Sequence, residues 1–105
     1  MTRIGTRFVP VSALRSVLFE GKPIAESFQG RHAEEASGHE LRKDKLRELF
    51  QRGAGAVAKA AGPVVVVVGK LSGKMHVDQG RHRIEVAREL GPKQRILVRF
   101  VRGRM

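Results

Sequence analysis

The run KMHVDQGRHRIEVARELG, residues 74–91, decides the fold that this chain is expected to adopt. It predicts a short strand over Met75–Val77, a tight turn at Gly80 and a helix over Arg81–Leu90. The pair Gly91-Pro92 then ends the helix. This strand–turn–helix pattern places the first backbone N–H groups of the helix beside the turn, where they have no intrahelical acceptor.

The start of this helix is the candidate site. Arg81, His82 and Arg83 crowd an end where the helix dipole already carries about half a positive charge. Carboxylates are favoured there and cations are not, so the placement favours a bound anion. Gly80 lets such an anion approach the backbone closely. The predicted ligand of Gly80, Arg81, His82 and Arg83 is therefore a phosphate group of a nucleotide or a nucleic acid.

Three side chains near this turn are candidates for binding or catalysis. His82 would bind phosphate or act as a general acid or base, and the alternative is a surface histidine. Arg83 is favoured as a bidentate phosphate clamp that contributes little to the core, against the alternative of a solvent-facing helix residue. Asp78 would hold a metal ion or orient His82 or Arg83, and a plain turn-forming role is an equal alternative.

The other elements complete a small α/β (α+β) domain. The five valines Val64–Val68 are typical of a central strand buried on both faces of a sheet, paired with Met75–Val77 or Ile96–Val101. In the helix over Arg81–Leu90, we expect Ile84, Ala87 and Leu90 to face inward. Further strands and helices are predicted at Phe8–Leu14 (an edge or strand end, because of Pro10), Glu40–Arg52, Ala54–Ala61 and Arg95–Arg102. Residues 1–105 are thus read as one domain, a small mixed β-sheet with flanking helices and a long irregular loop over about 20–39.

The charge of the chain favours a polyanionic partner. It carries 21 Lys and Arg against 10 Asp and Glu, a formal net charge of +11. Residues 53–105 hold eleven of the basic residues and three of the acidic ones, so the excess follows the half with the Gly80 turn. The alternative is that the charge only keeps the protein in solution.

Composition also limits the function classes. The absence of cysteine excludes disulfides, a thiolate nucleophile and a Cys-ligated zinc site. The longest apolar run is too short to span a bilayer, so a soluble protein without a membrane partner is expected. His32, Glu35 and His39 would meet at a metal only if their loop were helical, and no metal site is predicted.

Contacts with nucleic acid are expected to be mainly electrostatic. There is no Trp or Tyr and only five Phe, which argues against recognition by base stacking. Arg42, Lys45, Lys74 and Arg81 are the candidate contacts to a phosphate backbone. For Arg42 and Lys45, the simpler alternative is a solvated helix face.

The chain resembles the ParB/sulfiredoxin superfamily in five short segments. They are VPVSAL (9–14), LRELF (46–50), PVVVVV (63–68), GRHR (80–83) and ILVRF (96–100), and the similarity is strongest over residues 63–101. The resemblance implies a small mixed sheet with flanking helices that binds nucleotide phosphates at the Gly80–Arg83 turn. Members of the superfamily include CTP-dependent DNA clamps, ATP-dependent sulfinic acid reductases, free-serine kinases, nuclease-like proteins and toxin modules.

Departures from the pattern narrow these activities. Sulfiredoxins carry Cys where this chain has Arg81, and the clamps carry Glu-Arg-Arg after the glycine and a downstream helix-turn-helix domain. The resemblance then implies a toxin-like effector acting on nucleic acid or nucleotide, either nuclease-like or NTP-dependent. It further implies a nucleotide triphosphate with Mg²⁺ as cofactor, with Glu35 or Glu34 as an acidic loop residue beside it. The candidate catalytic residues are then His82, Asp78 and Glu35.

The toxin interpretation has consequences for partner and place of action. A toxin of this kind would have an acidic immunity protein as partner, and it would act in the cytoplasm of a bacterial target cell. A protein of the same family that is not a toxin would stay in the cytoplasm of the producing bacterium.

Two other functions stay open at this point. One is a non-catalytic module that binds DNA or nucleotide and acts by occupancy. The other is a metal-independent ribonuclease toxin, with His82 and His76 as acid and base and Arg83 stabilising the phosphorane. Turnover would separate an enzyme from a binder, and a requirement for metal would argue against the ribonuclease.

Overall fold

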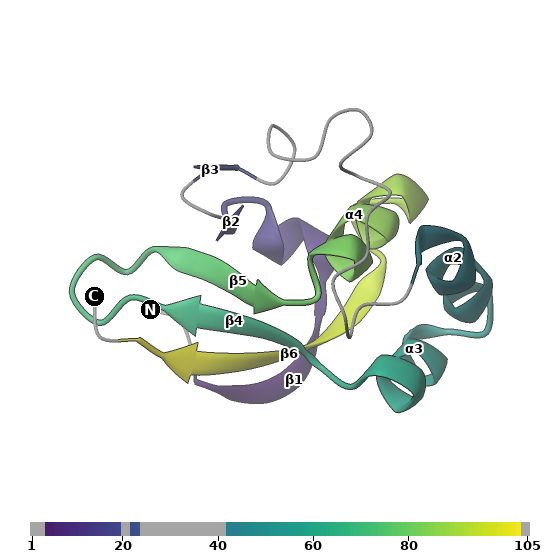
Figure 1. The fold of residues 1–105 in the computed structure, drawn as a ribbon, viewed down its shortest axis with the longest axis horizontal. Coiled ribbons are helices and arrows are strands. Elements are labelled where there is room, and N and C mark those ends of the chain that lie inside the picture. The colour runs from purple at the N-terminus through teal and green to yellow at the C-terminus, as the bar shows by residue number, and fades with distance from the viewer. Residues whose placement is uncertain (1–3, 20–21, 24–41, 104–105) are drawn as a thin grey trace.

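The computed structural model describes residues 4–19, 22–23 and 42–103, and it confirms the α+β class (Figure 1). A six-stranded mixed sheet has the order β1-β6-β4-β5-β2-β3. Its strands are β1 (Gly5–Pro10), β2 (Leu18–Phe19), β3 (Lys22–Pro23), β4 (Val64–Val68), β5 (Met75–Gln79) and β6 (Arg95–Arg102). The helices are the 3-10 helix η1 (Val11–Leu14), α2 (Lys43–Gln51), α3 (Ala54–Ala61) and α4 (Arg81–Leu90).

The valine strand β4 lies inside the sheet, parallel to β6 and antiparallel to β5. Both predicted pairings are therefore present. Val64 and Val66 are fully buried, whereas Val65, Val67 and Val68 are half-buried. The prediction of burial on both faces is thus right for one face only, because the other face of the sheet is partly open.

The strand register separates the two faces of the sheet. The inner face consists of Val9, Val64, Val66, Val77, Ile96, Val98 and Phe100, all of them buried. Residues of η1 and α4, among them Val11, Leu14, Ile84 and Ala87, complete the same core. The outer face includes Thr6, Phe8, Val65, Val67, His76, Gln79, Leu97, Arg99 and Val101, all half-buried or exposed.

The first strand differs from its prediction at both ends. β1 begins at Gly5 and ends at Pro10, and the expected strand residues Val11–Leu14 form η1 instead. Proline cannot donate to a strand ladder and has a fixed φ, so the chain leaves the sheet there. The expected edge position is confirmed, since β1 pairs only with β6 in the described sheet.

The helices match their predictions closely. α3 and α4 have the predicted bounds, and α2 begins three residues later than expected. The inward position of Leu90 is wrong: this residue, the last of α4, is 48% exposed. No helix among residues 4–19, 22–23 and 42–103 combines the length and the apolar character needed to cross a membrane.

The irregular loop predicted over about 20–39 lies largely outside the described residues. Only Lys22–Pro23 of that range is described, and these two residues form β3, paired antiparallel to β2. This short strand was not predicted from the sequence.

Candidate functional site

The turn before α4 depends on Gly80, which has a left-handed conformation with φ of 103° and is the N-cap of the helix. A Cβ at this position would lie 2.8 Å from Cγ2 of Val64 and 2.9 Å from Nη2 of Arg83. Only glycine combines that conformation with so close an approach.

A β-bulge directly precedes this turn. Val66 pairs with Val77 and Val65 pairs with Gln79, so Asp78 is the extra residue in β5. Bulges bend a strand and redirect the side chains that follow. Asp78 is exposed there.

Arg83 has a different environment from the one expected. Its side chain is 1% exposed, and Nη1 donates hydrogen bonds to the main-chain carbonyls of Gly62 and, at 3.3 Å, Ala61. These carbonyls lie at the end of α3, where helix carbonyls lack intrahelical partners and attract cations. The expectation that Arg83 contributes little to the core is therefore wrong, because its guanidinium holds the start of α4 against the end of α3.

His82, the second residue of α4, is completely buried. Neither Nδ1 nor Nε2 has a hydrogen-bond partner within the described part of the chain. A neutral imidazole presents one N–H donor and one acceptor, and each buried polar group without a partner costs about 1–3 kcal/mol. The surface-histidine alternative is thus wrong, and a ligand, a water molecule or a residue outside the described ranges is needed to satisfy the ring.

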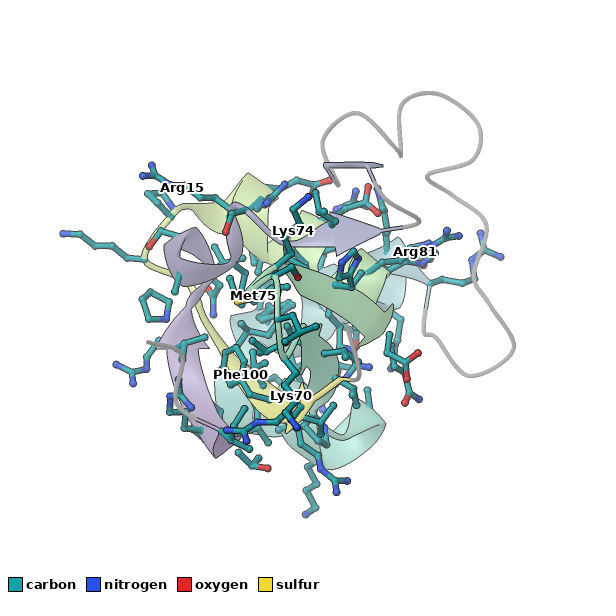
Figure 2. All side chains as sticks on the ribbon, turned by 90° about the vertical axis from the view of Figure 1, so that its left-hand side faces the viewer. Arg15, Lys70, Lys74, Met75, Arg81 and Phe100 are labelled. Carbon is teal, nitrogen blue, oxygen red and sulfur yellow. The ribbon has the colours of Figure 1, made fainter. Side chains whose placement is uncertain are left out.

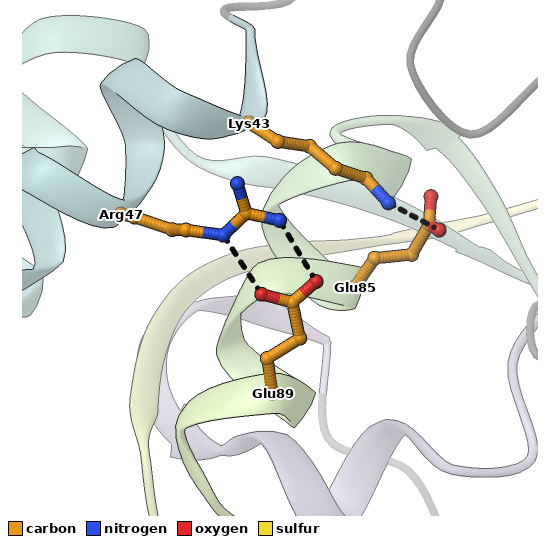
Figure 3. A network of polar contacts seen from close by, with 4 residues as sticks. All are labelled: Lys43, Arg47, Glu85 and Glu89. Atoms are coloured by element: carbon orange, nitrogen blue, oxygen red, sulfur yellow. Dashed lines mark hydrogen bonds and ion pairs between the residues drawn. The ribbon is translucent and has the colours of Figure 1, made fainter. Parts of the chain in front are cut away.

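A buried ion pair lies one helical turn beyond His82. Lys43 Nζ of α2 donates to Oε1 of Glu85 of α4 at 3.0 Å, and the two side chains are 7% and 12% exposed (Figure 3). Oε2 of Glu85 is buried and has no partner among the described residues. Burial raises the pKa of Glu85, and the hydrogen bond and charge of Lys43 oppose that rise.

These three residues, His82, Glu85 and Lys43, form what we call the buried polar cluster. His82 and Glu85 are three residues apart on α4, so they share one side of the helix. Within the described part of the chain, three polar atoms of this cluster therefore have no hydrogen-bond partner. Sequence patterns did not reveal Glu85 or Lys43, because the two residues lie 42 positions apart in the chain.

A second, more exposed pair joins the same two helices. Arg47 donates from Nε and Nη2 to the two carboxylate oxygens of Glu89, at 2.9 and 3.1 Å (Figure 3). This bidentate hydrogen bonding by Arg47 lowers the pKa of Glu89. The two pairs together fix α2 alongside α4.

The remaining predicted site residues do not form one patch. Arg81 is the first residue of α4 and half-buried, whereas Lys74 is exposed at the opposite end of β5 (Figure 2). Arg42 and Lys45 are exposed on α2, within 3.7 Å of Asp44 and 3.8 Å of Glu48 respectively. Glu34 and Glu35 lie outside the described residues, as do His32 and His39.

The two histidines proposed as an acid–base pair lie on different sides of the sheet. His76 pairs with Val67 of the outer face, whereas the Gly80 turn that leads to His82 packs on Val64 of the inner face. This arrangement does not favour the ribonuclease mechanism. Within the described residues, no three His, Asp or Glu side chains converge as a metal site would require.

Comparisons of the chain with models of protein families, with curated proteins and with solved structures found no match. The resemblance to the ParB/sulfiredoxin superfamily rests on the sequence motifs alone.

Proposed function

We propose that this chain is a phosphate-recognition domain, which binds a phosphate of a nucleotide or nucleic acid at the start of α4. The observation that carries the proposal is His82, fully buried at that helix end with both ring nitrogens unpartnered among the described residues. Native proteins rarely leave such groups unsatisfied unless a ligand or a function requires them.

The helix end itself supports the proposal. Among the described residues, no side chain caps the start of α4, and the first turn of this helix contains no acidic residue. Side-chain caps and acidic residues are the usual partners of the N–H groups at a helix start. A phosphate oxygen would take their place and would interact favourably with the dipole.

The surrounding side chains would take separate roles. The imidazole of His82 would donate a hydrogen bond to a phosphate oxygen, and Arg81 would add positive charge at the rim. Arg83 would hold the turn in place rather than clamp the ligand, because its guanidinium is buried against Ala61 and Gly62. The Lys43–Glu85 pair would hold the side of α4 that bears His82.

This proposal includes the wider activity implied by the family resemblance. The chain would then be an effector of the ParB/sulfiredoxin type that acts on nucleic acid or nucleotide, with Mg²⁺ entering together with a nucleotide triphosphate. Asp78, exposed directly before the turn, would be available to such an ion. A toxin-like effector of this kind would be countered by an acidic immunity protein.

A non-catalytic binding module is the second candidate function. It is favoured by the lack of a convergent set of acidic and histidine side chains among the described residues. Turnover of a nucleotide or oligonucleotide by the purified chain, with and without Mg²⁺, distinguishes the two candidates.

The binding site is tested by NMR titration of the ¹⁵N-labelled chain with inorganic phosphate, CTP with Mg²⁺, ATP with Mg²⁺ and a short DNA oligonucleotide. At least one of these ligands should shift the backbone amides of Arg81, His82 and Arg83 most strongly. Shifts confined to other parts of the chain would contradict the proposed site.

Substitution of His82 gives the sharper test. His82→Leu removes two unsatisfied polar atoms from the core, so thermal stability should be kept or increased while ligand affinity falls about tenfold or more. Lys59→Ala, at an exposed position on α3, is the matched control and should bind as the wild type does. A lower melting temperature with unchanged affinity would make His82 a structural residue and overturn the proposal.

A further inference from the structure

Apart from Asp78 near the end of β5, the described strands and the elements next to them have a one-sided charge. Residues 4–19, 53–77 and 91–103, which we call the strand side, contain nine Lys and Arg residues and no Asp or Glu. The five described carboxylates lie elsewhere, at Asp44, Glu48, Asp78, Glu85 and Glu89. These segments therefore present only positive charges to a partner that binds there.

The outer face of the sheet belongs to this strand side and is apolar at its centre. Phe8 is 40% exposed and lies directly opposite Leu97 in the register of β1 and β6. Val67 lies beside Val101 in the register of β4 and β6. Leu97, Val67 and Val101 are all half-buried. The helices α2 and α3 lie beyond one end of the strands (Figure 1).

The charged residue within this face is an arginine. Arg99 is exposed and pairs with Val65 of β4, and Arg95 is exposed at the start of β6. Aromatic, aliphatic and arginine side chains without Lys, Asp or Glu are the composition of the buried centre of protein–protein interfaces. The exposed lysines of the strand side, such as Lys59, Lys70 and Lys74, lie outside this face.

This composition fits a protein better than a nucleic acid. Single-stranded nucleic acids are held by rows of aromatic side chains, whereas Phe8 is the one Phe among the described residues named for the outer face. Valine and leucine offer a base little, whereas an apolar protein surface would remove them from water. A second copy of this chain is disfavoured, because each copy carries a net charge of +11.

We propose that the outer face is a docking surface for an acidic protein. Aliphatic side chains of that protein would pack on Phe8, Leu97 and Val67, and a carboxylate would pair with Arg99. This surface is distinct from the proposed phosphate site, since the Gly80 turn packs on Val64, which faces the opposite side of the sheet.

A random peptide library displayed on phage and selected against the immobilised chain tests this inference. The enriched peptides should combine aliphatic and acidic residues, and their binding should weaken as salt is added. Arg99→Glu and Leu97→Thr should each lower the affinity of these peptides about tenfold or more. Lys59→Glu is the control, because it makes the same change of charge on α3 and should have a much smaller effect.

Circular dichroism and thermal melting of each variant establish that the fold is kept. Enriched peptides without acidic residues, or peptides that bind Arg99→Glu as well as the wild type, would overturn the proposal. The proposal would also be overturned if the wild type bound a fluorescent oligothymidine and this binding were lost in Leu97→Thr and Arg99→Glu. The surface would then bind a nucleic acid. Sedimentation velocity gives a third test. Self-association of the wild type that is abolished in Leu97→Thr would overturn the proposal, because the surface would then bind a second copy of the chain.

Discussion

The helices α2 and α4 and the strand side of the molecule use basic residues in different ways. Between the helices, Lys43 and Arg47 are paired with carboxylates, and Arg83 is bonded to main-chain carbonyls. The strand side has nine basic residues and no carboxylate. The comparison teaches that the basic residues occupy two settings. Those between the helices stabilise the fold, and those of the strand side are the ones that our proposal assigns to a partner.

The largest effect should come from Arg83. Arg83→Ala should lower the free energy of unfolding by about 3–5 kcal/mol, because it leaves a cavity and removes the donor from two carbonyls. Arg99→Ala on the outer face should change it by less than about 0.5 kcal/mol. Urea denaturation followed by circular dichroism measures both. Equal stability of the two variants would contradict the claim that basic residues stabilise the fold at the helices and not on the strand side.

The Gly80 turn should be the next most sensitive position. Gly80→Ala should cost about 2–4 kcal/mol, from the strained backbone and from contact with Val64 and Arg83. Gly73→Ala is the control on the strand side: Gly73 also has a positive φ, but no atom lies within 4 Å of the added Cβ. That variant should lose only about 1–2 kcal/mol. A comparable loss for both glycines would mean that backbone strain alone decides the effect.

The two ion pairs between α2 and α4 should differ in strength. Glu85→Ala should cost about 2–3 kcal/mol, because it removes the hydrogen-bond acceptor of the buried Lys43 ammonium. Glu89→Ala should cost less than about 1 kcal/mol, since its pair with Arg47 is half-exposed. Thermal or urea denaturation of both variants gives the comparison. A larger loss of stability for Glu89→Ala than for Glu85→Ala would contradict the prediction that the fold depends more strongly on the buried pair.

The smallest effect concerns acid titration. The pKa of Glu85 is raised by burial and that of Glu89 is lowered by Arg47, so Glu85 should take up a proton at the higher pH. The ionised form of Glu85 lowers the stability of the folded protein, because its folded pKa is raised. That stability should return as the pH falls through this folded pKa, which lies above about 4.3. Stability that Glu89 contributes should be lost as the pH falls through its folded pKa, below about 4.3. Carboxyl ¹³C NMR titration tests the order, and the reverse order would contradict it.

The sequence predicted those elements that are specified by residues within them or next to them in the chain. The bounds of α3, β4, α4 and β6 agree with the structure because glycine and proline residues flank three of them and a valine run marks β4. The special role of Gly80 was also predictable, since glycine is the residue that readily takes a positive φ in a tight turn between a strand and a helix.

Features that depend on distant contacts could not be predicted. The acceptors of Arg83 lie about twenty residues earlier in the chain, and the partner of Lys43 lies 42 residues later. An arginine in a first helical turn and a lysine on a charged helix look exposed unless those neighbours are known. The open outer face was missed for the same reason, because a run of valines does not show which of its faces another element covers.

The pairing of β1 with β6 sets the order in which this chain can fold. Gly5 lies opposite Phe100 and Pro10 lies opposite Arg95, so these strands join segments about ninety residues apart in sequence. The hairpin of β4 and β5 closes over only six residues between its strands and can form early. We therefore expect β1 to dock last during folding and to detach first during local opening. Amide hydrogen exchange would then be faster in Arg7 and Val9 than in Val66 of the central strand.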